Sequence, residues 1–140
     1  MAEPKTRPTD ASVDDYLSAI ADAGRRADAE TVAALMREVT GEPAVMWGTT
    51  IVGFGALTYQ GSRTTRSWPV VAFAPRAKEL VLYLNTELEP GLFETLGRHR
   101  RGVGCLYIRR LSDVDPVVLR TLVERSAALA APEARERALQ

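Results

Sequence analysis

The stretch that decides the fold is SWPVVAFAPRAKELVLYLN, residues 67–85. It contains two apolar runs, 68–74 and 80–84, on either side of a short turn at 75–79. Both runs are rich in β-branched and aromatic residues and are bounded by turn-forming residues, which is typical of two strands joined as an antiparallel hairpin. The sequence therefore predicts a sheet that begins as an antiparallel meander.

Two further strands flank this hairpin along the chain. Residues 51–59 have the composition of a strand and carry Gly53 and Gly55 on one face, a pattern that indicates close approach of another group. A polar loop at 60–67 connects this strand to the next. Residues 104–109 alternate in character and predict a fourth strand.

Two helices are predicted before the strands. Ser12 followed three residues later by Asp15 indicates an N-terminal capping box, and we expect the first helix to end near Gly24. A second apolar stripe at helical spacing predicts a helix that begins at Asp28 and stops at Gly41.

Two more helices are predicted toward the C-terminus. Residues 89–96 fit a short helix ended by Gly97. Asp115 precedes Pro116, and this pair suits the N-cap and first position of a longer helix. We expect that last helix to end near Pro132.

The predicted order of elements is ααβββαβα, in a chain of 140 residues with 46% apolar content. This length and composition suit one domain with one core. We therefore expect an α+β fold in which an antiparallel sheet has helices packed on one face. The expected boundaries are a flexible N-terminal tail at 1–11, a single domain at 12–131 and a flexible C-terminal tail at 132–140.

Composition argues against several classes of partner. Lysine plus arginine number 18 and aspartate plus glutamate number 18, so the zero net charge argues against nucleic acid. Apolar runs are too short to cross a membrane, and the first residues do not form a signal peptide, so we expect a cytoplasmic protein. One cysteine and one histidine are too few for a Cys/His zinc site.

The common catalytic motifs are absent from the sequence. Gly53-Phe54-Gly55 lacks the third glycine of a dinucleotide-binding loop, and no phosphate-binding loop, nucleophile elbow or HExxH pattern occurs. Cys105 and His99 are close enough in sequence for a thiolate–imidazole pair, although a strand cysteine is more often a small buried residue. We therefore favour a protein without enzymatic activity.

The main candidate site combines tryptophans with an arginine-rich loop. Residues 98–101 have the cations to hold a phosphate or carboxylate, or to stabilise the end of the preceding helix. Trp47 and Trp68 each precede a strand, where they line a cleft or are buried in the core. We expect these groups to share one concave site for a small anionic ligand. Its candidate residues are Trp47, Gly48, Trp68, Pro69, Arg76, His99, Arg100, Arg101, Cys105 and Tyr107.

Carboxylates on the first two predicted helices form a weaker candidate site. Oxygen ligands suit hard cations, with Fe(II) as one candidate. These positions do not form a tight i, i+4 cluster, so solvation of the helix surfaces is the simpler interpretation. The residues concerned are Asp14, Asp15, Asp22, Asp28 and Glu30.

An ordered set of motifs covers most of the chain, from about Val13 to Ser126. They are VMWG at 45–48, IVGFG at 51–55, WPVVAFAPR at 68–76, LVLYL at 80–84, LGRH at 96–99, CLYI at 105–108 and LSDVD at 111–115. In these motifs the sequence resembles the YdhG-like family, bacterial domains of unknown function. The resemblance implies a frataxin-like α+β layout. Frataxin-like iron chaperones are among the relatives, so it also implies iron handling as a candidate role.

The sequence departs from the family in one loop. Val103 and Gly104 stand where members commonly have lysine and serine. If the family holds an anion with that loop, this chain must use Arg100 or Arg101 instead.

Three functional hypotheses follow. The first is a non-enzymatic domain that binds a small anionic ligand or iron, with iron implied by the resemblance alone. The second is a small enzyme that acts on an anionic metabolite, with His99 as general acid or base. The third is a protein-interaction module or homodimer that uses an exposed sheet face or an edge strand.

Overall fold

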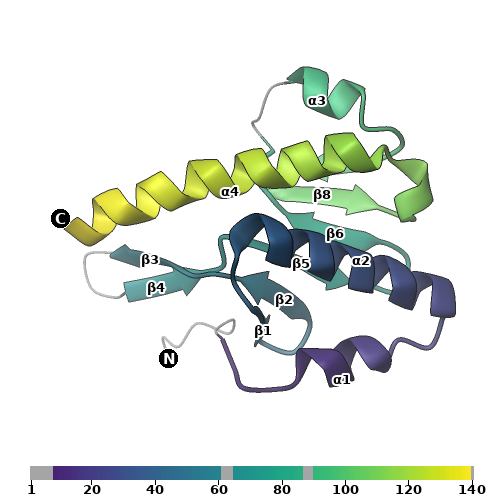
Figure 1. Ribbon diagram of the computed structural model, residues 1–140, viewed down its shortest axis with the longest axis horizontal. Coiled ribbons are helices and arrows are strands. Elements are labelled where there is room, and N and C mark those ends of the chain that lie inside the picture. Colours follow the sequence, from purple (N-terminus) through teal and green to yellow (C-terminus); the bar gives the residue numbers. More distant parts are fainter. Residues whose placement is uncertain (1–7, 61–64, 87–89, 140) are drawn as a thin grey trace.

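A six-stranded sheet with helices on one face forms the body of the protein (Figure 1). The computed structural model describes residues 8–60, 65–86 and 90–139. The helices are α1 (Val13–Ser18), α2 (Ala23–Thr40), α3 (Pro90–Glu94), the 3₁₀ helix η1 (Leu111–Asp113) and α4 (Pro116–Leu139). The strands are β1 (Ala44–Trp47), β2 (Ile51–Phe54), β3 (Leu57–Gln60), β4 (Thr65–Trp68), β5 (Val71–Pro75), β6 (Leu80–Tyr83), β7 (Arg100–Gly102) and β8 (Cys105–Ile108).

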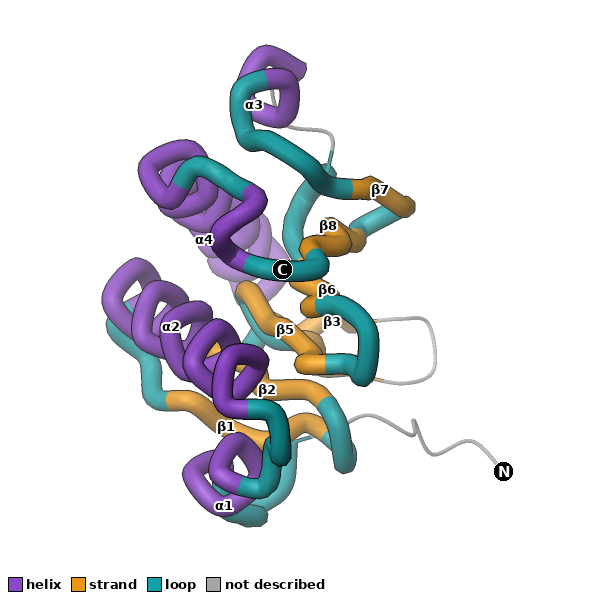
Figure 2. The backbone as a smooth tube through the Cα atoms, turned by 90° about the vertical axis from the view of Figure 1, so that its right-hand side faces the viewer, coloured by secondary structure: helices purple, strands orange, loops and turns teal. Residues whose placement is uncertain are grey.

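The six-stranded sheet has the order β1-β2-β5-β6-β8-β7, and each neighbouring pair is antiparallel. The predicted hairpin is β5–β6, at the centre of the sheet, with Phe73 opposite Leu82. Helices α2 and α4 cover one face, and Figure 2 shows them together on one side of the strands. We call the other side, on which none of the described helices packs, the helix-free face. The α+β class with helices on one face is thus confirmed.

The core lies between the sheet and these two helices. Phe73 and Leu82 point into it from the central strands, and both are fully buried. Met36 from α2 and Leu122 from α4 meet them and are equally buried. Burying each such side chain contributes about 1.5–3 kcal/mol, so this layer fixes which face of the sheet turns away from the helices.

Helix α2 begins earlier than the sequence predicted. It starts directly after Asp22, whose carboxylate caps it by accepting a hydrogen bond from the Arg25 backbone N–H at 2.8 Å. The predicted start, Asp28, lies inside the helix and accepts a hydrogen bond from the Leu111 backbone N–H at 3.1 Å. The predicted end is confirmed, because Gly41 caps the helix with a φ of 70°.

Helix α1 confirms the predicted N-cap but is shorter than expected. The Asp15 backbone N–H donates to Ser12 Oγ at 3.0 Å. The helix ends at Ser18, well before Gly24, because Asp22 caps a new helix four residues later. The expected single helix up to Gly24 is therefore wrong.

The segment before α1 lies against the outer edge of β1. Pro8 forms a β-bridge with Trp47, and the Thr9 backbone N–H donates to the Met46 carbonyl at 2.8 Å. This part of the expected tail therefore covers a sheet edge, which limits pairing with other chains there. Residues 1–7 of that tail lie outside the described residues.

The predicted strands at 51–59 and 68–74 are each divided in two. Gly55 has a φ of 71° and turns the chain out of the sheet after β2. Pro69, which has no N–H for a sheet ladder, separates β4 from β5. Between these points the chain forms a second, two-stranded sheet from β3 and β4. Thr65–Trp68 therefore takes in the end of the predicted polar loop, and residues 61–64 of that loop lie outside the described residues.

The chain turns sharply after α3, at Gly97. This glycine has a φ of 116°, and a Cβ there would collide with the carbonyl of Asp113. The predicted helix up to residue 96 is shorter in the structure, since α3 ends at Glu94, and backbone conformation and space explain why Gly97 makes the turn that follows. Glu89, the predicted first residue of this helix, lies outside the described residues.

Helix α4 begins as predicted and ends later. The Asp115 carboxylate accepts a hydrogen bond from the Val117 backbone N–H at 2.9 Å, next to Pro116 at the first helical position. The helix continues past Pro132 to Leu139, so the expected end at Pro132 is wrong. Within the described ranges, no helix combines the length and apolar character needed to span a membrane.

Candidate functional site

The strand register places the candidate residues in rows across the sheet. Ala72 lies opposite Tyr83, which lies opposite Cys105. In the next row on the same face, Val81 lies opposite Tyr107. Side chains alternate between the two faces of a strand, and Phe73 and Leu82 face the helices, so both rows lie on the helix-free face.

Trp47 forms a wall of this face and is itself buried. Its side chain is 2% exposed. A Cβ at Gly53 would lie 2.5 Å from Trp47 Cδ1 and 2.8 Å from the Pro69 Cβ, so the indole lies directly against the strand. The predicted close approach at Gly53 is confirmed. Gly48 has a φ of 69° in the turn after Trp47, so its role there is conformational.

Aromatic rings continue from this wall across the sheet. The Trp47 and Trp68 rings are edge to face, with centroids 6.4 Å apart. Trp68 and Tyr83 also meet edge to face, with centroids 5.8 Å apart. Trp68 and Tyr83 are half-buried, unlike Trp47, so they present ring surface to solvent on the helix-free face.

Arg76 extends from the β5–β6 turn to the same face. Its backbone N–H donates to the Glu79 carbonyl at 3.0 Å, which closes the turn. Hydrogen bonding with Tyr83 raises the pKa of the Arg76 guanidinium, and the nearby Tyr107 and Cys105 contribute in the same direction. Among the described residues, Arg76 forms no ion pair with a carboxylate. The face therefore has a cation that is placed near aromatic rings and that no described carboxylate neutralises.

Arg100 reaches this face from the edge strand β7, but its charge is paired. Its guanidinium donates to Glu79 Oε1 at 2.7 Å and its Cζ lies 3.9 Å from the Tyr107 ring centroid. Hydrogen bonding with Cys105 raises the pKa of the Tyr107 hydroxyl. Arg100 thus holds the Tyr107 ring in place, which fixes one border of the face.

Arg101 and His99 do not join this group. The predicted loop at 98–101 ends in a strand, so Arg100 and Arg101 point to opposite faces. Arg101 Cζ lies 4.4 Å from the Phe93 ring centroid, and the ring centroids of His99 and Phe93 are 5.9 Å apart. His99 Nδ1 is 2.8 Å from the Gly97 carbonyl oxygen. The expectation that all residues of the arginine-rich loop share one concave site with the tryptophans is therefore wrong.

Cys105 is equally separated from His99. The thiol is free and half-buried, beside Tyr107 on the helix-free face. The contacts of His99 are with Phe93 and Gly97 instead. The structure therefore does not bring the two residues together as a thiolate–imidazole pair.

Sequence reasoning left out Tyr83, which connects Trp68 to Arg76. Tyr83 could have been found from the sequence, because side chains of the run at 80–84 alternate between the two faces of a strand. Leu82 belongs to the buried stripe, so its neighbour Tyr83 must point to the other face. Its ring and hydroxyl group make it a natural member of the site.

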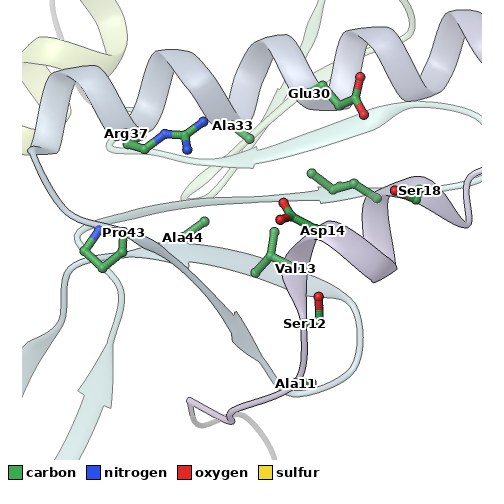
Figure 3. A pocket seen from close by; sticks show the side chains of 11 residues that line it. Ala11, Ser12, Val13, Asp14, Ser18, Glu30, Ala33, Arg37, Pro43 and Ala44 are labelled. Carbon is green, nitrogen blue, oxygen red and sulfur yellow. The ribbon is translucent and has the colours of Figure 1, made fainter.

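The helix carboxylates are spread over several structural roles. Asp22 caps α2 and Asp28 holds the backbone of Leu111. Asp14 and Glu30 line a groove of about 600 Å³ between α1 and α2 together with Arg37 (Figure 3). Within the described part of the chain, no group of three or more histidine, cysteine, aspartate or glutamate residues is placed to hold a metal ion.

Comparison with known proteins gave no match: neither a family model, nor a curated protein, nor a solved structure is significantly similar to this chain.

Proposed function

We propose that this protein is a non-enzymatic binding domain for a small aromatic anion, which it holds on the helix-free face. The observation that carries the proposal is the guanidinium of Arg76, which lies near Tyr83, Tyr107 and Cys105 and has no carboxylate partner among the described residues. A guanidinium is a planar donor that matches a carboxylate with two parallel hydrogen bonds. Arg76 is therefore the anchor for the charged end of the ligand.

Half-buried rings provide the surface for the ring of the ligand. Trp68 and Tyr83 already meet edge to face at 5.8 Å, and Tyr107 is fixed under Arg100. Rings that are positioned in advance lose little side-chain entropy on binding. A flat aromatic group can thus stack on or against them while its carboxylate stays beside Arg76.

The ligand has one anionic group, because Arg76 is the one cation identified on this face without a carboxylate partner in the described part of the chain. Arg100 already forms an ion pair with Glu79, and Arg101 lies on the opposite face. Trp47 supports the site from beneath the surface and does not itself contact the ligand, since it is 2% exposed. We therefore propose an aromatic monocarboxylate as the ligand class.

Isothermal titration with 2-naphthoate tests this proposal. Two other probes separate its parts: acetate carries the charge without the ring, and 2-naphthylmethanol carries the ring without the charge. We expect saturable binding of 2-naphthoate and much weaker binding of either control. Equal heats from acetate and 2-naphthoate would exclude a role for the aromatic rings.

A matched pair of variants locates the site. Arg76→Gln removes the anchor and should weaken 2-naphthoate binding by about tenfold or more, the value of one charge-assisted hydrogen bond. Arg101→Gln removes the same charge from the other face and should leave affinity unchanged. The reverse pattern would place the ligand beside Phe93 and contradict the proposal.

Sedimentation distinguishes this function from self-association. A monomer at the titration concentrations agrees with an open face. A dimer that dissociates when Trp68 is replaced by alanine would show that a second copy covers the rings, and would refute the small-ligand function.

A further inference from the structure

A second groove, separate from the helix-free face, gathers cations from three segments of the chain. It has a volume of about 690 Å³ and lies at the end of the sheet where α2 begins. Its walls come from the start of α2, the β5–β6 turn and the residues that follow β8. The lining residues are Asp22, Arg25, Ala77, Lys78, Glu79, Arg109 and Arg110.

In the described part of the chain, the two acids of this groove already have hydrogen-bond or ion-pair partners, whereas its cations have no carboxylate partner. The Asp22 carboxylate accepts a hydrogen bond from the Arg25 backbone N–H at 2.8 Å. Glu79 forms its ion pair with Arg100, which is not a lining residue, at 2.7 Å. Among the described residues, the four lining cations form no ion pair with a carboxylate. The lining therefore carries four positive and two negative charges, an excess of positive charge.

The lining also indicates which chemistry suits it. Ala77 is its one apolar residue, and no aromatic side chain lines the groove. Three of its cations are arginines, whose guanidinium groups bind phosphate oxygens in pairs. The start of α2 adds the positive end of a helix dipole, although its Arg25 N–H is occupied by the cap.

We infer that this groove binds a diphosphate group, either as free pyrophosphate or as the phosphates of a nucleoside diphosphate. Four cations on three segments line the groove, and two linked phosphates offer them more charge and more acceptor oxygens than a single phosphate does. This inference does not rest on the proposed function. The groove shares only the β5–β6 turn with the helix-free face, and Arg76 is not among its lining residues.

Isothermal titration of the full chain with pyrophosphate, at low ionic strength, tests the inference. We expect saturable binding with one site per chain that weakens at about 0.15 M salt, because the groove is open to solvent. Lys78→Gln and Arg110→Gln should each weaken it by about three- to tenfold. Absence of saturable binding at low ionic strength would overturn the inference.

Arg37→Gln is the matched control. It removes a charge from the same helix, about 18 Å along the axis from Arg25, and Arg37 lines a different groove. We expect unchanged pyrophosphate affinity. A loss equal to that of Lys78→Gln would show a diffuse field of charge in place of a site.

Three further probes separate the possible ligands. Orthophosphate should bind at least about tenfold more weakly than pyrophosphate; equal affinity would refute the diphosphate assignment. Adenosine diphosphate that binds as tightly as pyrophosphate supports recognition of the phosphates alone. A short DNA duplex that binds more tightly than pyrophosphate would replace the small ligand by a nucleic acid and overturn the inference. Arg76→Gln should bind pyrophosphate normally, so failure of this site and failure of the aromatic site are distinguishable.

Discussion

Replacing Gly53 by alanine tests how closely the helix-free face is packed. The added Cβ would lie 2.5 Å from Trp47 Cδ1 and 2.8 Å from the Pro69 Cβ. Optimal carbon–carbon contacts are about 3.5–4.0 Å, so both neighbours would have to move by about 1 Å. Both are rigid rings, and Trp47 is 2% exposed. We expect Gly53→Ala to lower the free energy of unfolding by about 2–3 kcal/mol, the upper part of the range for overpacking.

Urea denaturation followed by far-UV circular dichroism measures this loss. Trp47→Leu removes most of the ring and should relieve part of the clash. In a double-mutant cycle, the double variant should therefore lose at least about 1 kcal/mol less stability than the two single variants together. Gly91→Ala is the control, because no atom lies within 4 Å of its added Cβ and the residue is in a helix. It should be neutral or slightly stabilising.

Two results would refute this reasoning. One is a Gly53→Ala variant within about 0.5 kcal/mol of the wild type, the range of ordinary surface substitutions. The other is strict additivity with Trp47→Leu, because residues that compete for the same space must be coupled.

Three other predictions concern the framework of the site. Asp28→Ala should cost about 1–2 kcal/mol in urea denaturation, because the Leu111 N–H loses its acceptor, whereas Asp28→Asn keeps an acceptor oxygen and should cost less; equal losses would contradict this role. Burial raises the pKa of Tyr16 above its ordinary value of 10.0, so the folded protein binds this proton more tightly than the unfolded chain does. The resulting stability is complete below pH 10 and is lost as the pH rises through the folded pKa of Tyr16. The free energy of unfolding of Tyr16→Phe should therefore fall less than that of the wild type between pH 9 and about pH 11. Parallel pH profiles of the two proteins would contradict this prediction. Gly97→Ala should lower the melting temperature by about 5 °C or more, because φ is 116° there and the Cβ meets the Asp113 carbonyl; a calorimetric shift under about 1 °C would be contrary to the structure.

The sheet and its helix-covered face were predictable because their signals are local and repeated. The hairpin at 67–85 was recognised from β-branched runs around a short turn, and it became β5–β6. Gly41 and Asp115 mark helix ends by chemistry that acts within one turn. Each of these predictions depends on a few adjacent residues, which is why each was confirmed.

The wrong predictions concern choices between similar local signals. Asp22 and Asp28 are both possible N-caps, and the tertiary hydrogen bond of Asp28 to Leu111 comes from a distant segment that the local pattern does not reveal. Pro132 commonly ends a helix, yet α4 continues through it.

The candidate site was predictable only in part, because a face depends on strand register. Arg76 and Tyr107 lie near each other, and Trp68 is connected to Arg76 through Tyr83, which was not among the predicted site residues; the loop at 98–101 was treated as one unit. Once Arg100–Gly102 is a strand, adjacent arginines must point to opposite faces. The alternation of side chains between the two faces follows directly once a strand is known, but β7 was not predicted as a strand.

The resemblance to the YdhG-like family, and the iron handling that it implies, stay predictions. The aromatic-anion function makes a different demand on the chain, since it depends on Arg76 and the rings of the helix-free face. The decisive question is therefore which face of the sheet an aromatic anion contacts when it binds.

Intermolecular nuclear Overhauser effects from bound 2-naphthoate to the protein test the central claim most directly. The account predicts contacts from the naphthyl protons to the ring protons of Trp68, Tyr83 and Tyr107, and none to Phe93. Contacts to Phe93 or His99 instead, with none to Trp68 and Tyr83, would contradict it.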